Sequence, residues 1–487
     1  MDLPPGGDVD TQADRDQQHI ALVLGALATA FFLVRVLGGP WPHFPATYPD
    51  SFSYLKVAAR GPFHFKFYFD ERPIGYPLLQ WSMGRSTTLI VVAQTLIYVT
   101  AFWVLCMVLV KELSSRTVAF IAVVLIGAVA IEPRNSLWND VILSESFSSS
   151  LAILSIAAWF RAAARPSLRT LKWAWIGTVA WILVRDTNVL PTLLVILPGA
   201  LGLLFFIPRR ERQIRRRLIV GAVSVVLVCG YVYVSQAHSH RTQYSVDDVV
   251  GMRVLPHPSI TKWFVQGGMP LDDALRARTG HNAWDDNSAF LDAPNLAKYR
   301  TWARGPGGRR LLLSMVFLAP DWWKDFHHEL PNILKQPNTE YDSYGVAKRL
   351  PTHWPAPLGE PRTTAAFWFE LWLAAAGLTI AAFERRRRLI VYMLAIGMLS
   401  AIVDVWTSYT GDPMEVNRHL VGPMLRLDVL ALMAIAIGAD SAFTQFRTWR
   451  KTRNAPTPEP ATDETETGIE TPEAPTTGDT KDVTVDA

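Results

Sequence analysis

Residues 87–110 read TTLIVVAQTLIYVTAFWVLCMVLV, an unbroken run of 24 residues with no charged side chain. A helix of about 20 apolar residues is long enough to cross the hydrocarbon core of a bilayer, so this run predicts a membrane span. Further windows of this kind are separated by polar breaks, at about 19–38, 116–132, 141–162, 171–184, 187–207, 217–235, 363–383, 389–405 and 419–440. The sequence therefore predicts an all-α polytopic membrane protein with about ten transmembrane helices.

The composition excludes several other classes of protein. Of the 487 residues, 50% are hydrophobic and 18% are charged, which is not the balance of a water-soluble globule or of a disordered chain. Both cysteines, Cys106 and Cys229, lie inside apolar windows, so they predict neither a disulfide framework nor a cysteine-based zinc site. The sequence has no Walker loop, Rossmann glycine pattern or GxSxG motif, which argues against a nucleotide enzyme and a serine hydrolase.

The distribution of lysine and arginine between the short loops predicts the orientation in the membrane. The loops on one side hold the Arg209–Arg217 cluster and the Arg385–Arg388 run, whereas the short turns on the other side carry only Arg134, Arg185 and Arg418. Because positive loops stay inside, we expect a multi-pass protein of the plasma (inner) membrane with both termini in the cytoplasm.

Spans and loops together predict the domain organisation. The 236–362 segment is far too long for an ordinary connection, so we expect it to fold as a mainly helical extracytoplasmic domain. Within it, Pro320–Leu334 predicts a helix lying on the membrane surface. The predicted parts are a disordered cytoplasmic N-terminus (1–18), a module of seven spans (19–235) with a first outer loop (39–86), the extracytoplasmic domain (236–362), three C-terminal spans (363–440) and a mostly disordered, acidic cytoplasmic tail (441–487).

Acidic and basic residues gather in the connections on the predicted outer side. Ionisable groups at this depth are unfavourable when unpaired, so they usually line a cavity or pair with one another. A carboxylate can take a proton from an attacking hydroxyl, while guanidinium groups hold a phosphate that leaves bearing charge. This layout predicts a membrane transferase that uses a lipid-phosphate donor.

Four motifs in residues 19–208 resemble the GT-C glycosyltransferase superfamily, which includes protein O-mannosyltransferases and aminoarabinose transferases. DSFSYLKVAARG (50–61) and RPIGYPLL (72–79) are similar to the first outer loop of that superfamily. NDVILSESF (139–147) is similar to its third-to-fourth-span region, and LVRDTNVLPTLLVILP (183–198) to its arginine-containing turn. The resemblance implies a GT-C-like fold and an inverting transfer of a sugar from a polyprenyl-phosphate donor to an acceptor hydroxyl, on the extracytoplasmic face.

The resemblance also implies roles for particular residues. Asp50 would be the catalytic base, and Asp140 or Glu145 would orient the sugar or the acceptor. The remaining expected site residues are Arg72, Arg185, Arg418 and His419 for the donor phosphate, and Tyr54, Glu415 and Trp263 for contacts with substrate. The expected partners are the sugar donor, a glycan, lipid or protein acceptor of the cell envelope, and the bilayer, but no nucleic acid. An outer Asp-x-Asp motif is absent at Asp140, so no cofactor is predicted firmly and a divalent metal stays open.

Each of these residues also has a purely structural interpretation. Asp50 could cap a short helix that begins at Ser51, and Asp140 could cap the fourth span. Glu145 could pair with Arg185 for structure alone, and the arginines could be interfacial anchors. At the level of the whole chain, the alternatives are a transporter or lipid flippase and a non-catalytic envelope scaffold. A transporter should carry ionisable groups near the membrane midplane, where the sequence shows few.

Overall fold

The computed structural model describes residues 23, 25–26, 30, 45–239, 241–285, 290, 292–335, 363–414 and 416–453. The predicted first span at 19–38 therefore lies almost wholly outside the described residues, as do the N-terminus before it and the tail after Arg453. In the described part there is no strand, and the β-type pairing is one isolated bridge between Ala46 and Val141. The fold is all-α, as the sequence predicts.

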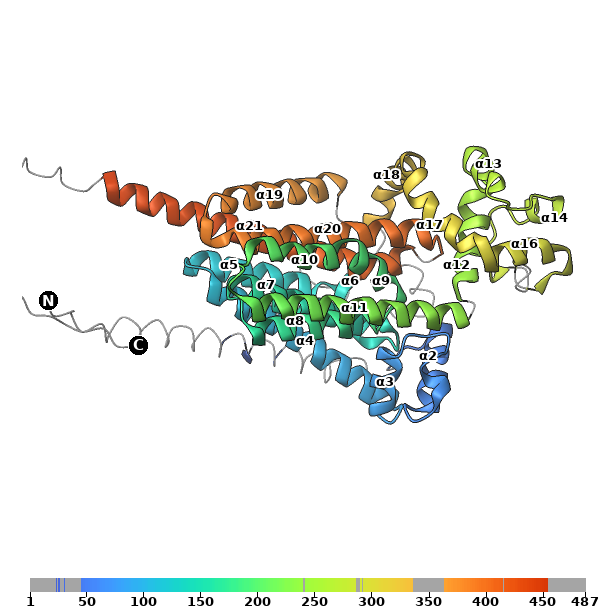
Figure 1. Ribbon diagram of the computed structural model, residues 1–487, viewed down its shortest axis with the longest axis horizontal. Helices are drawn as coiled ribbons and strands as arrows, with labels where there is room; N and C mark the ends of the chain where they lie inside the picture. Colours follow the sequence, from blue (N-terminus) through green and yellow to red (C-terminus); the bar gives the residue numbers. More distant parts are fainter. Residues whose placement is uncertain are drawn as a thin grey trace, which may run out of the picture. The chain divides into compact units, whose positions relative to one another are not determined.

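Within the described residues, seven helical segments are long and apolar enough to cross a membrane. They are α4 (Thr87–Glu112), α7 (Ser144–Ala164), the Asp186–Phe206 segment that ends in α10 (Leu197–Phe206), α11 (Arg212–His238), α19 (Thr364–Ala382), the Arg385–Gly411 segment that contains α20 (Arg388–Gly411), and α21 (Val416–Arg453) (Figure 1). Two further predicted spans correspond to shorter helices, α5 (Arg116–Ile131) with 16 residues and α8 (Leu168–Ile182) with 15. Seven long segments plus these two account for nine of the ten predicted windows.

Helix α7 packs against α4, α8 and α20. It is unusually rich in serine for an apolar helix, and Ser146, Ser149 and Ser150 are buried. Small side chains let helix backbones approach one another closely within a membrane. At the crossing with α8, a Cβ atom added to Gly177 would lie 3.1 Å from the Cα of Ser155. Small residues on both helices therefore bring α7 and α8 together.

The spans differ in how much of each the protein covers. In α21, 78% of the most apolar window is buried, whereas in α19 the value is 22%. The exposed side of α19 carries Phe369 and Trp372, which suits contact with lipid. Of the seven described segments, α21 is therefore the one that the protein covers most. It also continues to Arg453, beyond the predicted boundary at 440.

Residues 241–335, which we call the inserted domain, have a hydrophobic core of their own around Phe264, Phe290 and Trp302. The described helices of this domain are α12 (Arg241–Val249), α13 (Pro258–Gln266), α14 (Asp273–Arg276), α16 (Ala297–Trp302), α17 (Gly308–Phe317) and α18 (Ala319–Lys335). Two π-helical segments, η5 (Val250–Val254) and η7 (Ala303–Gly307), continue α12 and α16, and the 3₁₀ helix η6 (Pro294–Leu296) precedes α16. This part of the chain is helical, in agreement with the pattern of the sequence.

Helix α18 differs from its prediction as a surface helix. Its Trp322 is fully buried in the core of the inserted domain. Four further apolar side chains of the same helix join the core of the transmembrane bundle, namely Phe326, Leu330, Ile333 and Leu334. The amphipathic pattern was therefore correct, but its apolar face packs against protein and ties the inserted domain to the bundle.

Short helices and loops meet at one end of the bundle, which we call the α2 end: α2 (Pro49–Arg60), η1 (Phe65–Phe67), α3 (Gly75–Ser82), α6 (Pro133–Ser136), η2 (Leu137–Asp140), η3 (Asp186–Asn188) and α9 (Val189–Pro191). The amide of Gly75 donates to the Leu183 carbonyl at 2.8 Å, and a Cβ at Gly75 would meet that carbonyl oxygen at 2.8 Å. Glycine is required there. This contact holds the loop after α8 against α3, and so places Arg185 beside the first loop.

Candidate active site

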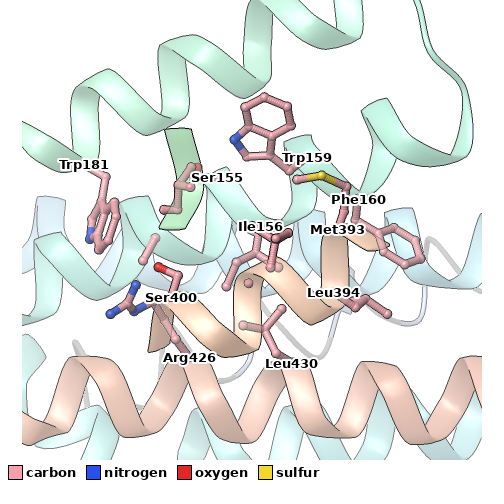
Figure 2. Close-up of a pocket in the computed structure, with 14 residues that line it drawn as sticks. Ser155, Ile156, Trp159, Phe160, Trp181, Met393, Leu394, Ser400, Arg426 and Leu430 are labelled. Carbon is pink, nitrogen blue, oxygen red and sulfur yellow. The ribbon is translucent and has the colours of Figure 1, made fainter. Parts of the chain in front are cut away.

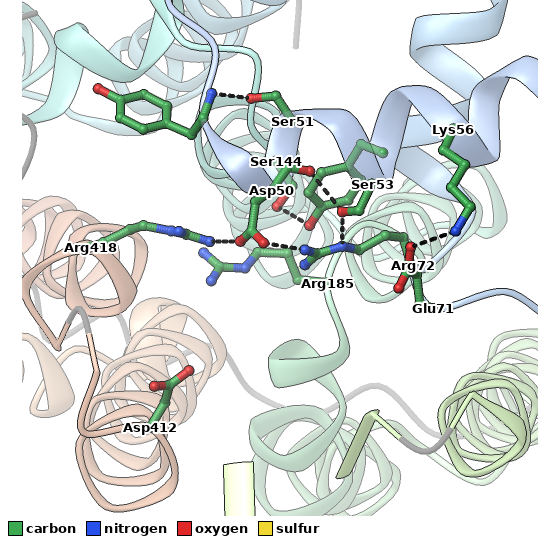
Figure 3. Close-up of polar contacts among 12 residues, drawn as sticks. Asp50, Ser51, Ser53, Lys56, Glu71, Arg72, Ser144, Arg185, Asp412 and Arg418 are labelled. Atoms are coloured by element: carbon green, nitrogen blue, oxygen red, sulfur yellow. Dashed lines mark hydrogen bonds and ion pairs between the residues drawn. The ribbon is translucent and has the colours of Figure 1, made fainter. Parts of the chain in front are cut away.

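Asp50 lies in the first turn of α2, after Pro49 at the first helical position. The helix cap is Tyr48, whose backbone amide donates to the Ser51 hydroxyl at 2.9 Å. Asp50 is therefore not the cap residue, contrary to the structural alternative. Its carboxylate instead lies between the guanidinium groups of Arg72 and Arg418, with one oxygen accepting from each (Figure 3).

Arg72 is held in place from three sides. Its Nε donates to the Ser53 hydroxyl at 2.6 Å, and its Nη2 donates to Asp50 Oδ1. The guanidinium also lies over the ring of Tyr54, 4.6 Å from the ring centre, which is a cation–π distance. Tyr54 is itself fixed by a 2.9 Å hydrogen bond between its hydroxyl and that of Ser144 on α7. Asp50, Ser53 and Tyr54 lie on one helix, and together they fix the position of the Arg72 guanidinium.

Arg418 joins the first loop to α7. Its Nη2 donates to Asp50 Oδ2 at 2.6 Å, and its Nε donates to Glu145 Oε1 at 2.6 Å. Glu145 is in the first turn of α7 and its side chain is only 2% exposed. Its other oxygen, Oε2, is buried and has no hydrogen-bond partner among the described residues. Two carboxylates that are 95 positions apart in sequence are therefore bridged by one guanidinium.

Arg185 and His419 continue this ion-pair chain. Arg185 Nη2 lies 3.8 Å from Glu145 Oε1 and 2.9 Å from His419 Nδ1. On the other side of the ring, His419 Nε2 lies 3.0 Å from Asp412 Oδ2. Burial raises the pKa of the Asp412 carboxyl, but the neighbouring His419 and Arg418 outweigh burial and lower it below the ordinary value. The chain runs from Arg72 through Asp50, Arg418, Glu145, Arg185 and His419 to Asp412.

Asp50 and Asp412 are more exposed than the guanidinium groups that lie between them in the chain. The side chains of Asp50 and Asp412 are each 33% exposed, whereas those of Arg418 and Arg185 are 7% and 10% exposed. A solvent-borne or membrane-borne molecule can therefore reach Asp50 while the guanidinium groups remain screened from bulk water. Electrostatic contacts in such a site are stronger than the same contacts in water.

The structure brings together six of the expected residues, Asp50, Tyr54, Arg72, Glu145, Arg185 and Arg418, with His419 directly beside them. Asp140 lies in the adjoining η2, where its backbone carbonyl accepts from the Ala46 amide at 3.0 Å. Trp263 lies on α13 of the inserted domain, and the guanidinium of Arg310 covers its ring at 3.2 Å from the centre. Glu415 lies outside the described residues.

A second buried pair lies deeper in the bundle than sequence reasoning expected. Arg426 on α21 donates to Asp404 on α20 and stacks over the Trp181 ring. It is eight residues beyond Arg418, about 12 Å along the helix. Charges are therefore not confined to the layer of connecting loops. The sequence did contain a signal for this pair, because Asp404 and Arg426 are charged residues that each interrupt an apolar window.

Asp247 and Asp248 on α12 were also missed. Both are almost fully buried, and Asp248 accepts from the Ala283 amide at 2.7 Å. Burial raises the pKa of Asp247 to about 7. Burial and the nearby charge of Asp412 raise the pKa of Asp248 to about 8. The only sequence signal was two adjacent acids in a helix, which is also the pattern of an ordinary exposed face.

A mainly apolar cavity of about 60 Å³ lies among α7, α8, α20 and α21 (Figure 2). Trp159, Phe160 and Leu430 line it, and Arg426 and Ser400 form its polar edge. A smaller hollow shares Trp181 and Arg426 with this cavity and is also lined by Arg185 and His419. The apolar cavity therefore adjoins the ion-pair chain.

Metal ligands are not grouped in the described part of the chain: no three His, Cys, Asp or Glu side chains there are arranged to hold an ion. What the described ion-pair chain offers chemically is an accessible carboxylate and a set of buried cations.

No family model and no curated protein matches the sequence. Two solved structures of the oligosaccharyltransferase AglB from the archaeon Archaeoglobus fulgidus are similar in fold. One, in complex with an inhibitory peptide and a dolichol-phosphate, is 15% identical, with a TM-score of 0.41. The other, tethered to an acceptor peptide, is 14% identical, with a TM-score of 0.43.

In both comparisons the match covers 90% of this chain, which spans about half the length of these relatives, 52% and 51%. At this identity and TM-score the likeness alone establishes neither the substrates nor the reaction.

Proposed function

We propose that the protein is an inverting glycosyltransferase that moves a sugar from a polyprenyl-phosphate donor to an acceptor hydroxyl. The observation that carries this proposal is the pairing of a one-third-exposed carboxylate, Asp50, with the buried guanidinium groups of Arg72 and Arg418. A base and phosphate-binding cations are the two elements that such a transfer requires. They come from separate segments of the chain and meet at one point.

In this reaction the acceptor oxygen attacks the anomeric carbon from the side opposite the phosphate. Asp50 takes the hydroxyl proton as the new C–O bond forms. The bond between the anomeric carbon and the phosphate oxygen breaks, and its electron pair stays on the phosphate. A single displacement of this kind inverts the configuration at the anomeric carbon. The leaving phosphate gains a negative charge, which guanidinium groups stabilise.

The phosphate also prepares the base. In the empty site, Arg72 and Arg418 both donate to Asp50 and hold its oxygens. A phosphate bound between Arg418 and Arg185 competes for the Arg418 hydrogen bond to Asp50 Oδ2, because each guanidinium has a fixed number of donors, while Arg72 still holds Oδ1. Donor binding would thereby release Asp50 to accept a proton. Glu145 Oε2, which has no hydrogen-bond partner among the described residues, is available to a hydroxyl group of the sugar.

The lipid part of the donor needs an apolar path that begins beside the phosphate. The cavity bounded by Trp159, Phe160 and Leu430 adjoins the site, with Arg426 at its polar edge (Figure 2). Its volume of about 60 Å³ is smaller than one prenyl unit, so the prenyl chain would have to widen it on binding before continuing among the lipid-facing helices. The α2 end would face the outside of the cell, with a glycan, lipid or protein of the envelope as acceptor.

A transporter or flippase is the second candidate, and one observation favours it. The buried Asp404–Arg426 pair lies within the membrane-spanning region, where transporters place their ionisable groups. The pair adjoins the same hollow as Arg185 and His419. A lipid phosphate could use both charged layers during passage across the membrane.

The deciding experiment measures sugar transfer from a panel of polyprenyl-phosphate sugars by the purified full-length protein in lipid nanodiscs. Native protein is compared with Asp50→Asn, which keeps the shape of the side chain but cannot accept the proton. Loss of a general base typically slows a reaction by about 10²–10⁴-fold. We expect transfer to fall by at least the lower figure while donor binding is kept.

Asp70→Asn is a matched control, because Asp70 lies in the same loop and pairs with Arg60 away from the chain of site residues. It should leave transfer nearly unchanged. Equal transfer by native protein and Asp50→Asn would refute Asp50 as the base. Movement of labelled polyprenyl phosphate across the bilayer without sugar transfer would favour the flippase.

A further inference from the structure

The contacts of His419 define its protonation state in the empty site. A guanidinium can only donate hydrogen bonds, so His419 Nδ1, 2.9 Å from Arg185 Nη2, must be the acceptor. A carboxylate only accepts, so Nε2, 3.0 Å from Asp412 Oδ2, carries the hydrogen. These partners assign the neutral tautomer with hydrogen on Nε2. A second proton, on Nδ1, cannot coexist with the Arg185 contact.

Among the described residues of the ion-pair chain, the charges balance when His419 is neutral. Asp50, Glu145 and Asp412 face Arg72, Arg185 and Arg418, and the deeper Asp404 is paired with Arg426. A phosphodiester brings one negative charge into this set. If it draws Arg185 towards itself, His419 Nδ1 also loses its hydrogen-bond donor. One proton on Nδ1 compensates for both changes, because it adds a positive charge and makes Nδ1 a hydrogen-bond donor.

We propose that His419 takes up a proton when the donor phosphate binds, and that its Nδ1–H then donates to a phosphate oxygen. The resulting imidazolium keeps its Nε2–H bond to Asp412, which becomes an ion pair. Histidine is the side chain suited to such a change near neutral pH. This inference rests on the proposed function, because it takes a lipid phosphodiester as the ligand of the site.

Charged groups face His419 from each of the elements packed around it. They are Asp412 in the connection after α20, Asp404 on α20, Glu145 on α7, Arg185 in the loop after α8 and Arg418 on α21 itself, with Asp248 of α12 beyond Asp412. Arg426 also lines the hollow beside His419 and pairs with Asp404, and Asp248 keeps its proton near neutral pH because its pKa is raised to about 8. Three charged acids therefore face three guanidinium groups, and once Arg185 has turned to the phosphate the remaining acids are in excess and stabilise an imidazolium.

The proton also has a role after binding. When the bond between sugar and phosphate breaks, the phosphodiester with one charge becomes a phosphomonoester with two. The acceptor's proton goes to Asp50, so it does not neutralise this new charge. An imidazolium that already donates to the phosphate meets the added charge by a stronger hydrogen bond, without any further proton transfer.

The test is calorimetric titration of the full chain in nanodiscs with the methyl ester of a polyprenyl phosphate. This probe is a phosphodiester with a single fixed charge and has no sugar to transfer. Titrations at about pH 7.5 in buffers of different ionisation enthalpy give the number of protons taken up per ligand. We expect close to one, and an affinity that falls by up to about tenfold per pH unit above that pH.

The decisive variant is His419→Asn, whose side-chain oxygen can still accept from Arg185 but cannot gain a proton. We expect the probe to bind with proton uptake near zero. His257→Asn is the matched control, because His257 also faces an aspartate, Asp325 at 3.8 Å, but lies in the inserted domain. It should bind with the native proton uptake.

Binding to native protein without proton uptake would overturn the inference and leave the proposed function standing. Uptake that persists in His419→Asn would assign the proton to another group and also overturn it. If that variant does not bind, Asp412→Asn decides: reduced uptake supports the inference, and native uptake contradicts it. Failure of both the methyl ester and the sugar donors to bind native protein would refute the proposed function itself, and the inference with it.

Discussion

At the scale of single residues, Arg418 has the most demanding role, because one guanidinium contacts two carboxylates through two different nitrogens. Lysine is a point charge that cannot satisfy both carboxylates in this geometry. We expect Arg418→Lys to lower the affinity for a polyprenyl-phosphate donor by about tenfold or more, the equivalent of one charge-assisted hydrogen bond. Calorimetric titration of the variant in nanodiscs measures this loss.

Arg60→Lys is the control for that substitution. Arg60 ends α2 and pairs with Asp70, but its side chain is 31% exposed and it contacts neither Asp50 nor Glu145 through the contacts seen here. Because this pair lies outside the chain of contacts from Arg72 to Asp412, donor affinity should change little. If Arg418→Lys behaved like Arg60→Lys, the phosphate would have to bind elsewhere.

The residues of the site could be predicted from sequence better than their pairing. Acids and arginines in several connections indicated one charged layer, and six of them do meet. The pairing of Glu145 with Arg185 was anticipated. The other partners could not be predicted, because Asp50 and Arg418 are 368 positions apart and tertiary packing decides which charges touch. The same packing put Asp412 at the end of the chain of contacts, where the sequence offered only one acid among several near His419.

Asp248 gives a prediction about stability against pH. Its pKa is raised from 3.8 to about 8 by burial and by the charge of Asp412. Between these values the unfolded chain has lost a proton that the folded chain keeps, so the free energy of unfolding falls as pH rises from about 4 to about 8. Asp248→Asn removes this decrease in the free energy of unfolding at high pH. The side-chain oxygen of the asparagine can still accept from the Ala283 amide.

Thermal unfolding in detergent at pH 5 and pH 8.5 tests the sign. The variant should melt at a higher temperature than native protein at pH 8.5 and show little gain at pH 5. Asp273→Asn, on the exposed side of α14, is the control and should follow the native protein at both pH values. A gain at pH 5 equal to that at pH 8.5 would contradict the assignment.

At the scale of elements, a buried clasp joins the α4–α5 connection to α21. The Asp440 carboxylate accepts from the amides of Ser114 and Ser115, at 2.9 and 2.6 Å, and from Arg387 at 2.5 Å. Arg387 also donates to the Ile437 carbonyl at 3.0 Å. One acid thus accepts hydrogen bonds at the start of α5 and at the start of α20, 22 residues after Arg418 along α21.

Replacing Asp440 by asparagine removes the negative charge and turns one acceptor atom into a donor that faces other donors. Breaking a buried ion pair from one side costs about 3 kcal/mol or more. We expect a clearly lower melting temperature in detergent. Arg165→Gln is the control, because Arg165 is 60% exposed at 3.1 Å from Glu112 and should contribute less than about 1 kcal/mol. Equal melting temperatures for the two variants would argue against the clasp.

Hydropathy predicts where a helix lies in the sequence better than it predicts what that helix packs against. The window at 87–110 became α4 at Thr87–Glu112, because the length of a span is set by the thickness of the bilayer. The amphipathic stretch at 320–334 did form a helix, but its apolar face packs on the bundle core. The period of a helix shows which face is apolar and does not show whether lipid or protein covers that face.

At the scale of the whole molecule, the proposed reaction depends on which side of the membrane the α2 end faces. Arginines cluster between α10 and α11, which predicts that this connection is cytoplasmic and that the loop between α2 and α3 is outside. Cys106 and Cys229 are buried, so they give little background in labelling with a thiol reagent. Lys66 in the α2–α3 loop and Arg210 before α11 are both exposed and suit single replacement by cysteine.

We expect Lys66→Cys to react with a membrane-impermeant maleimide in intact cells, and Arg210→Cys to react only after the cells are permeabilised. This outcome would put Asp50 on the side where a donor flipped to the outer leaflet meets an envelope acceptor. The reverse pattern would put Asp50 in the cytoplasm, where a transfer to envelope glycans has no acceptor. In that case the accessible carboxylate and its arginines would have to serve a different, cytoplasmic substrate, so the labelling pattern decides between the two.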